Sequence, residues 1–500
     1  IGYGAIDQRV NQRSREEVLV YNTTAELQLG RFLPESSGIR IPFLAQYYEE
    51  RRNPEFDPYD FDVPLKDKLD NADSQGERDS IRQLAQDFTR IQSIGFNNVR
   101  KERTGGGKPM PWDIENFRFT YGWTETYRRT PLVLEDRLTV HNGGFEYGYQ
   151  MTPLTIAPFK KLIKKDKYFK WLSEMNINLI PNSFRFTTDL DRSFRITRYR
   201  FTGTDIQNPA NTFFNKFFTW NRQYALNWDI AKNLRFNYNA NVNSVIDEPL
   251  EFDAENNRIS NQVRRDSIWN NILMLGRPKN YVHNLNVSYN VPTKNFPFLD
   301  WVNVKAQYDA SYSWSAASLN MDSLGNVISN NQTRQVSGDL NFETLYNKSN
   351  FLRKINRGNS GSRSRIGSSR GGGGGPATRG GKDDDKGKSG EPSAIAKALI
   401  RPLMMLRKAR LTVSEDFSTI VPGFMPRSSL MGLSSGFNAP GWDFVAGWQP
   451  DIAPGQNDWL RRAADQGWMT ESYFLSQEVL QNYSQTIDAR ITIEPITDFR

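Results

Sequence analysis

The sequence predicts an all-β protein that is part of a very large antiparallel transmembrane β-barrel with long extracellular loops and short helical connections. Three observations lead there. Stretches of about ten residues alternate between apolar and polar side chains, as strands with two different faces do. The 500-residue chain has a mean hydropathy of −0.66, yet 13% of its residues are aromatic. No run of about eighteen apolar residues occurs, which excludes a helical membrane protein.

A hairpin over residues 218–242 has the clearest alternation. Trp220, Tyr224, Leu226, Trp228, Phe236 and Tyr238 fall on one parity, and amide or basic side chains fall on the other. Each arm is about ten residues, which suffices for a tilted strand to cross a bilayer. We predict a tight turn at residues 229–233.

Along the chain, alternation predicts roughly thirteen strands. We expect them near residues 19–29, 39–47, 88–97, 117–127, 138–151, 184–201, the two arms of the hairpin, 285–291, 302–314, 334–346, 409–417 and 486–496. Helix-like runs occur at 78–86 and 160–170.

The connections divide into two kinds. Tight turns at 34–38, 229–233 and 292–299 fall on one side, and long polar loops fall on the other, as in outer-membrane barrels. There are exceptions. The connections 152–183 and 347–408 are long although they fall on the side of the tight turns, and 130–136 is short although it falls on the side of the long loops. We assign barrel strands to 1–350, with extracellular loops at 49–87, 202–216, 243–280 and 316–333. Strands in 409–500 flank a long extracellular cap or gate loop at 418–483.

Residues 351–393 are rich in Arg, Gly and Ser and are expected to form a disordered insert on the periplasmic side. The net charge of the chain is +8, and residues 351–390 carry ten basic residues against three aspartates, so the rest is nearly neutral. An RNA-binding segment is the less favoured interpretation, and no nucleic-acid partner is expected. Asp383–Asp385 lack the spaced ligands of a calcium loop. Residues 394–408 are predicted to form a short helix, with a membrane-surface segment as the alternative.

No catalytic constellation emerges. The chain lacks cysteine and has two histidines, His141 and His283, each in or beside a strand without partners for a triad or a zinc site. We therefore expect no enzyme, cofactor or metal. The chain begins at Ile1 and stops at Arg500 inside an alternating run, so we expect an internal or processed piece of a longer polypeptide.

Recognisable motifs occur in order along nearly the whole chain. They are RSREEVLVYNTTAELQLGRFLPE (13–35), EFDPYDFDVPLKDKL (55–69), FNNVRK (96–101), WDIENFRFTYGWTETYRR (112–129), IDEP (246–249), DSIWNNILMLGRPKNY (266–281), PFLDWVNVKAQYDASYSW (297–314), LYNKSNFLRKIN (345–356), VPGFMP (421–426), APGWDFVAGWQPDI (439–452) and ITIEP (491–495). In this order they resemble the SprA/Sov family, the giant outer-membrane translocon of the type 9 secretion system. The insert at 358–390 departs from the family.

The resemblance implies an integral outer-membrane channel that passes folded cargo, marked by a C-terminal signal, from periplasm to cell surface. It implies a wide pore with a lateral gate, an extracellular cap and a role that includes gliding motility. The implied partners are a PorV-type outer-membrane barrel, a periplasmic plug protein, the cargo and the lipid bilayer.

Within that framework we assign roles to three sets of residues. We expect Asn221, Gln223, Arg235, Asn237, Asn239 and Asn241 to line the hydrated pore. We expect Trp220, Tyr224, Leu226, Trp228, Phe236 and Tyr238 to face lipid. Pro422, Gly423, Phe424, Met425 and Pro426 are predicted to form a rigid apolar loop that contributes to the gate or to a partner contact, with packing inside the cap as the alternative.

Three other classes of protein stay open. A soluble antiparallel sheet with one solvated face gives the same alternation. A TonB-dependent or lipopolysaccharide-type transporter would also be a large barrel. A β-rich surface adhesin would leave the membrane without detergent.

Overall fold

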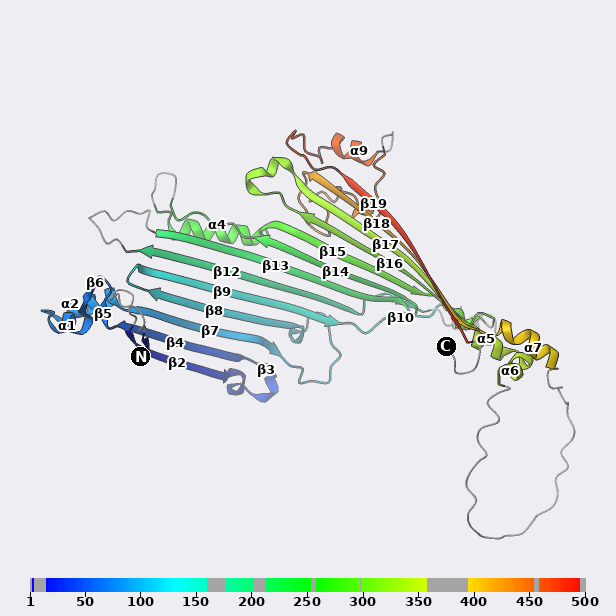
Figure 1. The fold of residues 1–500 in the computed structure, drawn as a ribbon, viewed down its shortest axis with the longest axis horizontal. Coiled ribbons are helices and arrows are strands. Elements are labelled where there is room, and N and C mark those ends of the chain that lie inside the picture. The colour runs from blue at the N-terminus through cyan, green and yellow to red at the C-terminus, as the bar shows by residue number, and fades with distance from the viewer. Residues whose placement is uncertain are drawn as a thin grey trace, which may run out of the picture.

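Most strands in the described part of the chain belong to one antiparallel sheet (Figure 1). The structure is a computed structural model that describes residues 2–3, 15–159, 176–200, 212–252, 258–296, 298–357, 394–453 and 458–494. In these residues the large sheet runs in chain order as β1-β2-β4-β7-β8-β9-β12-β13-β14-β15-β16-β17-β18-β19, with β3 paired to β7 beside this path, and β1 and β19 are the two edges of the sheet. The prediction of a mostly β chain with a large antiparallel sheet is thus confirmed, and closure of the sheet into a barrel stays a prediction.

Thirteen long strands, of twelve to twenty residues each, form the sheet within the described part of the chain. This agrees with the number predicted from alternation. They are β2 (Arg15–Gln28), β4 (Pro42–Pro54), β7 (Asp87–Lys101), β8 (Phe117–Arg129), β9 (Val133–Gln150), β12 (Ser183–Tyr199), β13 (Thr212–Ala231), β14 (Leu234–Val245), β15 (Arg277–Asn290), β16 (Val302–Ser315), β17 (Asn326–Asn341), β18 (Leu406–Phe424) and β19 (Leu480–Ile493).

Short elements fill the connections. The short strands are β1 (Gly2–Tyr3), β3 (Ile39–Arg40), β5 (Phe56–Asp57), β6 (Asp60–Pro64), β10 (Thr155–Ile156) and β11 (Ile177–Asn178). The α-helices are α1 (Leu65–Asp70), α2 (Gln75–Ala85), α4 (Asn261–Leu273), α5 (Phe342–Lys348), α6 (Asn350–Arg357), α7 (Ala394–Leu403), α8 (Trp442–Val445) and α9 (Trp459–Asp465). Single 3-10 turns are η2 (Leu29–Phe32), η3 (Glu35–Ser37), η4 (Ile114–Asn116), η6 (Thr293–Asn295) and η7 (Leu319–Leu324). No helix among the described residues is both long and apolar enough to cross a lipid bilayer.

Because the strands alternate in direction, the connections gather at two ends of the sheet (Figure 1). We call them the loop end, with α1, α2, α4, α8 and α9, and the turn end, with the tight β13–β14 turn and α5–α7. Ser74 begins α2 by accepting a hydrogen bond from the Glu77 backbone N–H at 3.2 Å, and Ser260 caps α4 in the same way through Val263 at 3.3 Å.

The strands are staggered along the sheet, and most of the stagger in the row followed here arises between β14 and β13. One row of directly paired residues crosses the sheet from Val327 in β17 to Thr120 in β8. Val327 lies one residue inside the loop end of its strand. The residues between them in the row are Ser315, Asn280, Asn243, Asn221, Asp189 and Gly144. Thr120 lies nine residues inside the loop end of its strand at Arg129. The drift is about eight residues over seven strand-to-strand steps. A strand rises about 3.3 Å per residue, and neighbouring strands lie about 4.8 Å apart. The drift therefore corresponds to a mean strand tilt of about 40° from the perpendicular to the line that joins the strand ends.

Several predicted loop boundaries were wrong because strands extend further than apolar alternation reveals. Strand β17 begins at Asn326, inside the loop predicted at 316–333, and β18 continues to Phe424, inside the loop predicted at 418–483. In the first case Asn330 and Gln332 occupy positions where alternation requires apolar side chains. In the second, Pro422 and Gly423 resemble a loop but lie at a register shift between β17 and β18.

Smaller corrections concern the other connections. Strands β4, β14, β15 and β19 also extend into the loops predicted at 49–87, 243–280 and 418–483, and the hairpin turn shortens to Lys232–Asn233. Strand β13 begins at Thr212, inside the loop predicted at 202–216, whose first ten residues lie outside the described part. Residues 351–357 of the predicted insert are helical in α6, and α7 ends at Leu403 before β18 starts. The rest of the insert and the predicted 160–170 helix lie outside the described residues.

Candidate functional site

The sheet has an amide face, named for Asn237, Asn239 and Asn241 in β14. All six residues predicted to line a pore lie on it: Asn221 pairs with Asn243, Gln223 with Asn241, and Arg235 with Ser288. One row of directly paired residues is polar across nine strands: Gln150, Ser183, Asn227, Asn237, Asn286, Asp309, Thr333, Asp416 and Ser484.

Side chains of this row hydrogen-bond across the strands. Asn227 Nδ2 donates to Ser183 Oγ at 3.0 Å, and Asn237 Nδ2 donates to Asn286 Oδ1 at 3.2 Å. Thr333 donates to Asp416 at 2.6 Å. Cross-strand polar pairs of this kind stabilise a sheet while leaving its surface hydrophilic. The amide face is therefore a broad surface suited to contact with water.

The opposite side of the sheet is the aromatic face, named for Tyr224 and Tyr238. In the half of each strand next to the turn end, it carries apolar side chains on all thirteen long strands, and we call these residues the apolar band. Its members are Ala25, Leu27, Phe43, Ala45, Ile94, Phe96, Phe119, Tyr121, Phe145, Tyr147, Phe184, Phe186, Leu226, Trp228, Phe236, Tyr238, Val287, Tyr289, Val304, Ala306, Val336, Leu340, Leu411, Val413, Ile487 and Ile491.

Many side chains of this band face away from the protein. Val336 is 52% exposed, Leu411 49% and Ile487 63%. An apolar surface this wide needs a nonaqueous neighbour. The six residues predicted to face lipid share this face, but Tyr224 and Tyr238 also pack against the buried cluster described next, and the Tyr238 hydroxyl lies 2.9 Å from that of Tyr281.

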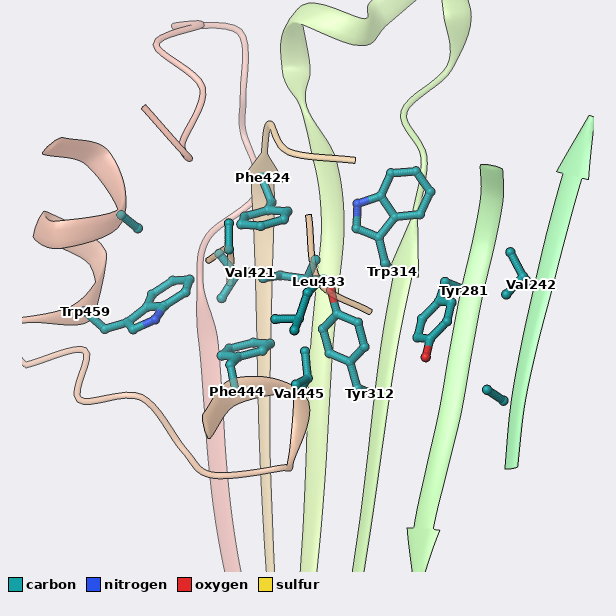
Figure 2. Close-up of a cluster of buried hydrophobic side chains, with 14 residues drawn as sticks. Val242, Tyr281, Tyr312, Trp314, Val421, Phe424, Leu433, Phe444, Val445 and Trp459 are labelled. Carbon is teal, nitrogen blue, oxygen red and sulfur yellow. The ribbon is translucent and has the colours of Figure 1, made fainter. Parts of the chain in front are cut away.

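Toward the loop end, the aromatic face of β14–β18 is covered by the segment 425–479 between β18 and β19, which we call the cap. Figure 2 shows the contact: Tyr281, Tyr312 and Trp314 on the strands face Leu433, Phe444 and Val445 of the cap. Trp459 stacks on Phe444, with ring centroids 5.4 Å apart. Tyr312 and Trp314 are each 1% exposed, so this cluster is the best-packed core in the described part of the chain.

Polar side chains of the strands also hold the cap by its backbone. Asn330 Nδ2 donates to Phe444 O at 3.1 Å and to Trp448 O at 2.9 Å. His283 Nε2 lies 2.7 Å from Val445 O, and the Tyr308 hydroxyl donates to Ala446 O at 2.6 Å. Strands β15, β16 and β17 thus satisfy the consecutive carbonyls of residues 444–446 at the C-terminal end of α8, which fixes the position of the cap on the sheet.

The predicted rigid apolar protrusion at 422–426 was wrong as local structure. Pro422, Gly423 and Phe424 are the last residues of β18, and Phe424 is 1% exposed within the cluster. Met425 is 41% exposed, and Pro426 O accepts a hydrogen bond from Trp314 Nε1 at 3.1 Å. The apolar side chains pack because the cap supplies the surface that covers them, as the alternative interpretation expected.

This placement separates two predicted sets. The 422–426 stretch packs with the aromatic face, whereas the predicted pore-lining residues lie on the amide face. Sequence reasoning also missed Arg222, which is buried on the aromatic face, stacks over Trp220 at 4.9 Å and donates to Ser244 Oγ at 2.8 Å. The sequence did contain a signal for it, because Arg222 has the same even parity in the hairpin as the residues of the aromatic face.

The two histidines have structural surroundings. His283 Nδ1 lies 3.0 Å from the Tyr281 hydroxyl, and His141 Nδ1 lies 3.0 Å from that of Tyr121. Within the described ranges, no three His, Asp or Glu side chains come together as a metal site requires.

Comparison with known families gives the class of the protein. Residues 1–69, which hold β2, β4, the β5–β6 pair and most of α1, match the family model SprA_N, described as a motility related/secretion protein. This similarity of residues 1–69 points to the motility- and secretion-related class of proteins. The match supports membership of the SprA/Sov family, as the motif resemblance predicted. No curated protein matches the chain.

Proposed function

We propose that the chain forms one arc of a very large outer-membrane barrel that conducts folded proteins in type 9 secretion. The observation that carries the proposal is the pairing of a polar row across nine strands with an exposed apolar band on the opposite face. An outer-membrane barrel needs this arrangement, with lipid outside and water inside. The tilt of about 40° also falls in the range of such barrels.

A hydrated wall of amides suits the passage of folded proteins. Exposed Asn239, Asn241 and Asn284 offer hydrogen bonds that water replaces easily, and little apolar surface to which a passenger would adhere. The cargo with its C-terminal signal, the PorV-type barrel and the periplasmic plug protein are proposed on the family resemblance. The loop end faces the cell surface in this proposal.

The cap bears on where a gate or partner acts. Because it lies on the aromatic face, it covers the outside of the wall above the membrane and leaves the amide face free. We therefore favour a partner contact over a pore constriction for Met425 and Pro426. The lateral gate is proposed on the resemblance alone.

Photo-crosslinking in secreting cells tests the conduit. A photoreactive residue at Asn239 is expected to capture cargo during secretion, whereas one at Leu411 in the apolar band is expected to capture none. Spin labels at the same positions give the environment independently: water-soluble relaxation agents should reach position 239, and oxygen dissolved in lipid should reach position 411. Lipid contact at position 239, or cargo captured equally at both positions, would overturn the proposal.

A further inference from the structure

Four arginines gather on the aromatic face in the loop half of β4, β7, β8 and β9. We call Arg51, Arg90, Arg129 and Arg137 the arginine cluster. Arg51 and Arg129 both pair with Phe88, and Arg90 and Arg137 both pair with Tyr127, so the four surround two neighbouring aromatic residues. The Phe88 and Tyr127 rings meet edge to face at 6.0 Å.

The guanidinium groups stack on these rings. Arg90 Cζ lies 5.6 Å and Arg137 Cζ 5.7 Å from the Tyr127 centroid, and Arg129 Cζ lies 4.9 Å from the Phe88 centroid. Stacking holds a guanidinium flat and leaves its N–H edge free to bind a planar or tetrahedral anion. The cluster is thus pre-organised, and side-chain exposures of 34% for Arg90 and 44% for Arg137 leave it accessible.

Acidic residues neutralise only part of the charge. Glu49 pairs with Arg51, Glu125 lies 3.4 Å from Arg90, and Glu135 lies 3.1 Å from Arg137. Arg129 makes no ion pair within the described residues; its Nη2 donates to Gln86 Oε1 at 3.2 Å. The buried Nε atoms of Arg90 and Arg129 have no hydrogen-bond partner. Two further arginines stand nearby, since Arg198 shares Glu135 and Arg200 binds the carbonyls of Thr130 and Gln83.

The height of the cluster on the wall points to its ligand. Arg90 lies four residues toward the loop end from Ile94 of the apolar band, about 13 Å along the strand and about 10 Å along the membrane normal at the tilt above. Headgroups occupy a layer just outside the hydrocarbon. An excess of guanidinium at that depth complements the phosphate groups found there.

We propose that the arginine cluster binds the phosphate groups of lipid headgroups in the leaflet at the loop end. This inference rests on the proposed function, because it requires the aromatic face to be the outer wall. Each bound lipid would place a phosphate oxygen between the accessible guanidinium groups of Arg90 and Arg137 and the Nη side of Arg129, which has no ion pair among the described residues.

Native mass spectrometry of the delipidated whole protein tests this with three probes: bisphosphorylated lipid A, the same lipid after dephosphorylation, and inorganic phosphate. We expect R129Q to lower retention of the phosphorylated lipid about fivefold and R90Q/R129Q about thirtyfold, because a cation at an anionic surface contributes about a factor of five. The matched control is R128Q, the neighbouring residue on the amide face, which should retain lipid like the parent. Where the double variant fails to assemble, R137Q takes its place with an expected loss of about fivefold.

Equal retention by R128Q and R129Q would overturn the proposal, as would equal retention of the dephosphorylated lipid. Full displacement of the lipid by inorganic phosphate at equal concentration would overturn its assignment to a headgroup. The label at position 411 separates the two levels of argument. If that label senses lipid while R129Q loses none, the inference fails and the barrel stands; if it senses water, the barrel fails as well.

Discussion

Asn330 in β17 bridges Phe444 and Trp448 of the cap, with its Nδ2 donating to Phe444 O at 3.1 Å and to Trp448 O at 2.9 Å. Asn330 is fully buried, and the next residue, Asn331, lies on the opposite face of the sheet. One amide group thus fixes two points of a segment more than a hundred residues away in the chain.

Replacing Asn330 with alanine is expected to loosen the cap. The change removes a buried donor from two carbonyls, at a cost of about 2 kcal/mol. Hydrogen exchange of residues 441–449 in the whole protein measures the effect, and amide protection there should fall. Asn331→Ala is the control, because Asn331 Nδ2 reaches only Ser311 Oγ on the amide face. Equal hydrogen exchange in the two variants would contradict the role of Asn330 in holding the cap on the sheet.

Gly447→Ala is expected to displace the cap from the sheet. A Cβ at this position would stand 2.7 Å from Ala310 Cβ, and Gly447 has φ +94°. Gly441→Ala is a matched control, because Gly441 also has a positive φ, of +110°, but no atom within 4 Å of the added Cβ. Both variants place an alanine at a positive φ, which costs about 1–3 kcal/mol, and only the first adds the clash. Limited proteolysis between α8 and α9 should therefore be faster in Gly447→Ala; similar rates would argue against close packing there.

Leu411→Arg is expected to impair assembly. In the proposed barrel its side chain points into lipid near mid-depth, where an arginine costs about 2–4 kcal/mol. Thr412→Arg places the same side chain on the amide face, where water solvates it. The amount of folded protein in outer membranes, read from its resistance to unfolding in detergent, should fall for the first variant only. Equal tolerance would mean that the apolar band does not meet lipid.

The connection between β14 and β15, which contains α4, is expected to loosen in acid. Both carboxylate oxygens of Asp247 accept hydrogen bonds from Arg277 at 2.8 Å, which lowers the pKa of Asp247 below its ordinary value. An aspartate whose pKa falls on folding stabilises the fold above its unfolded pKa, and this contribution is lost as pH drops through the folded value. Hydrogen exchange of residues 261–275, corrected for its intrinsic pH dependence, should thus rise below about pH 4. In Asp247→Asn that rise should be absent, and its persistence would point to another titrating group.

Sequence alone predicted the strands well, because a strand with one apolar face shows alternating apolar and polar residues over a short stretch of the chain. The hairpin of β13 and β14 and the amide parity of Asn237, Asn239 and Asn241 follow from adjacent residues. The strand predicted at 334–346 was shorter than β17 because Asn330 and Gln332 are polar where the pattern requires apolar residues. Their side-chain amides donate hydrogen bonds to distant partners, namely the cap carbonyls and the Tyr308 hydroxyl. No local pattern reveals such a partner.

Distant partners also explain why the sequence did not predict the structure of the candidate site. The 422–426 stretch contains two prolines and a glycine, which favour a loop, and only the cap residues Leu433 and Phe444 explain why Phe424 is buried at a strand end. The arginine cluster draws one residue from each of four strands, so its members are scattered in sequence. Register between strands, rather than composition, brings them together.

The cap also ties strands of the sheet together that are far from it in the chain. It connects β18 to β19, yet its backbone is tied to His283 in β15, Tyr308 in β16 and Asn330 in β17. A sideways load that separates neighbouring strands must therefore break the ladder and these side-chain ties together. Load sharing of this kind lets a thin sheet resist peeling from its β19 edge while a bulky object presses on the other side.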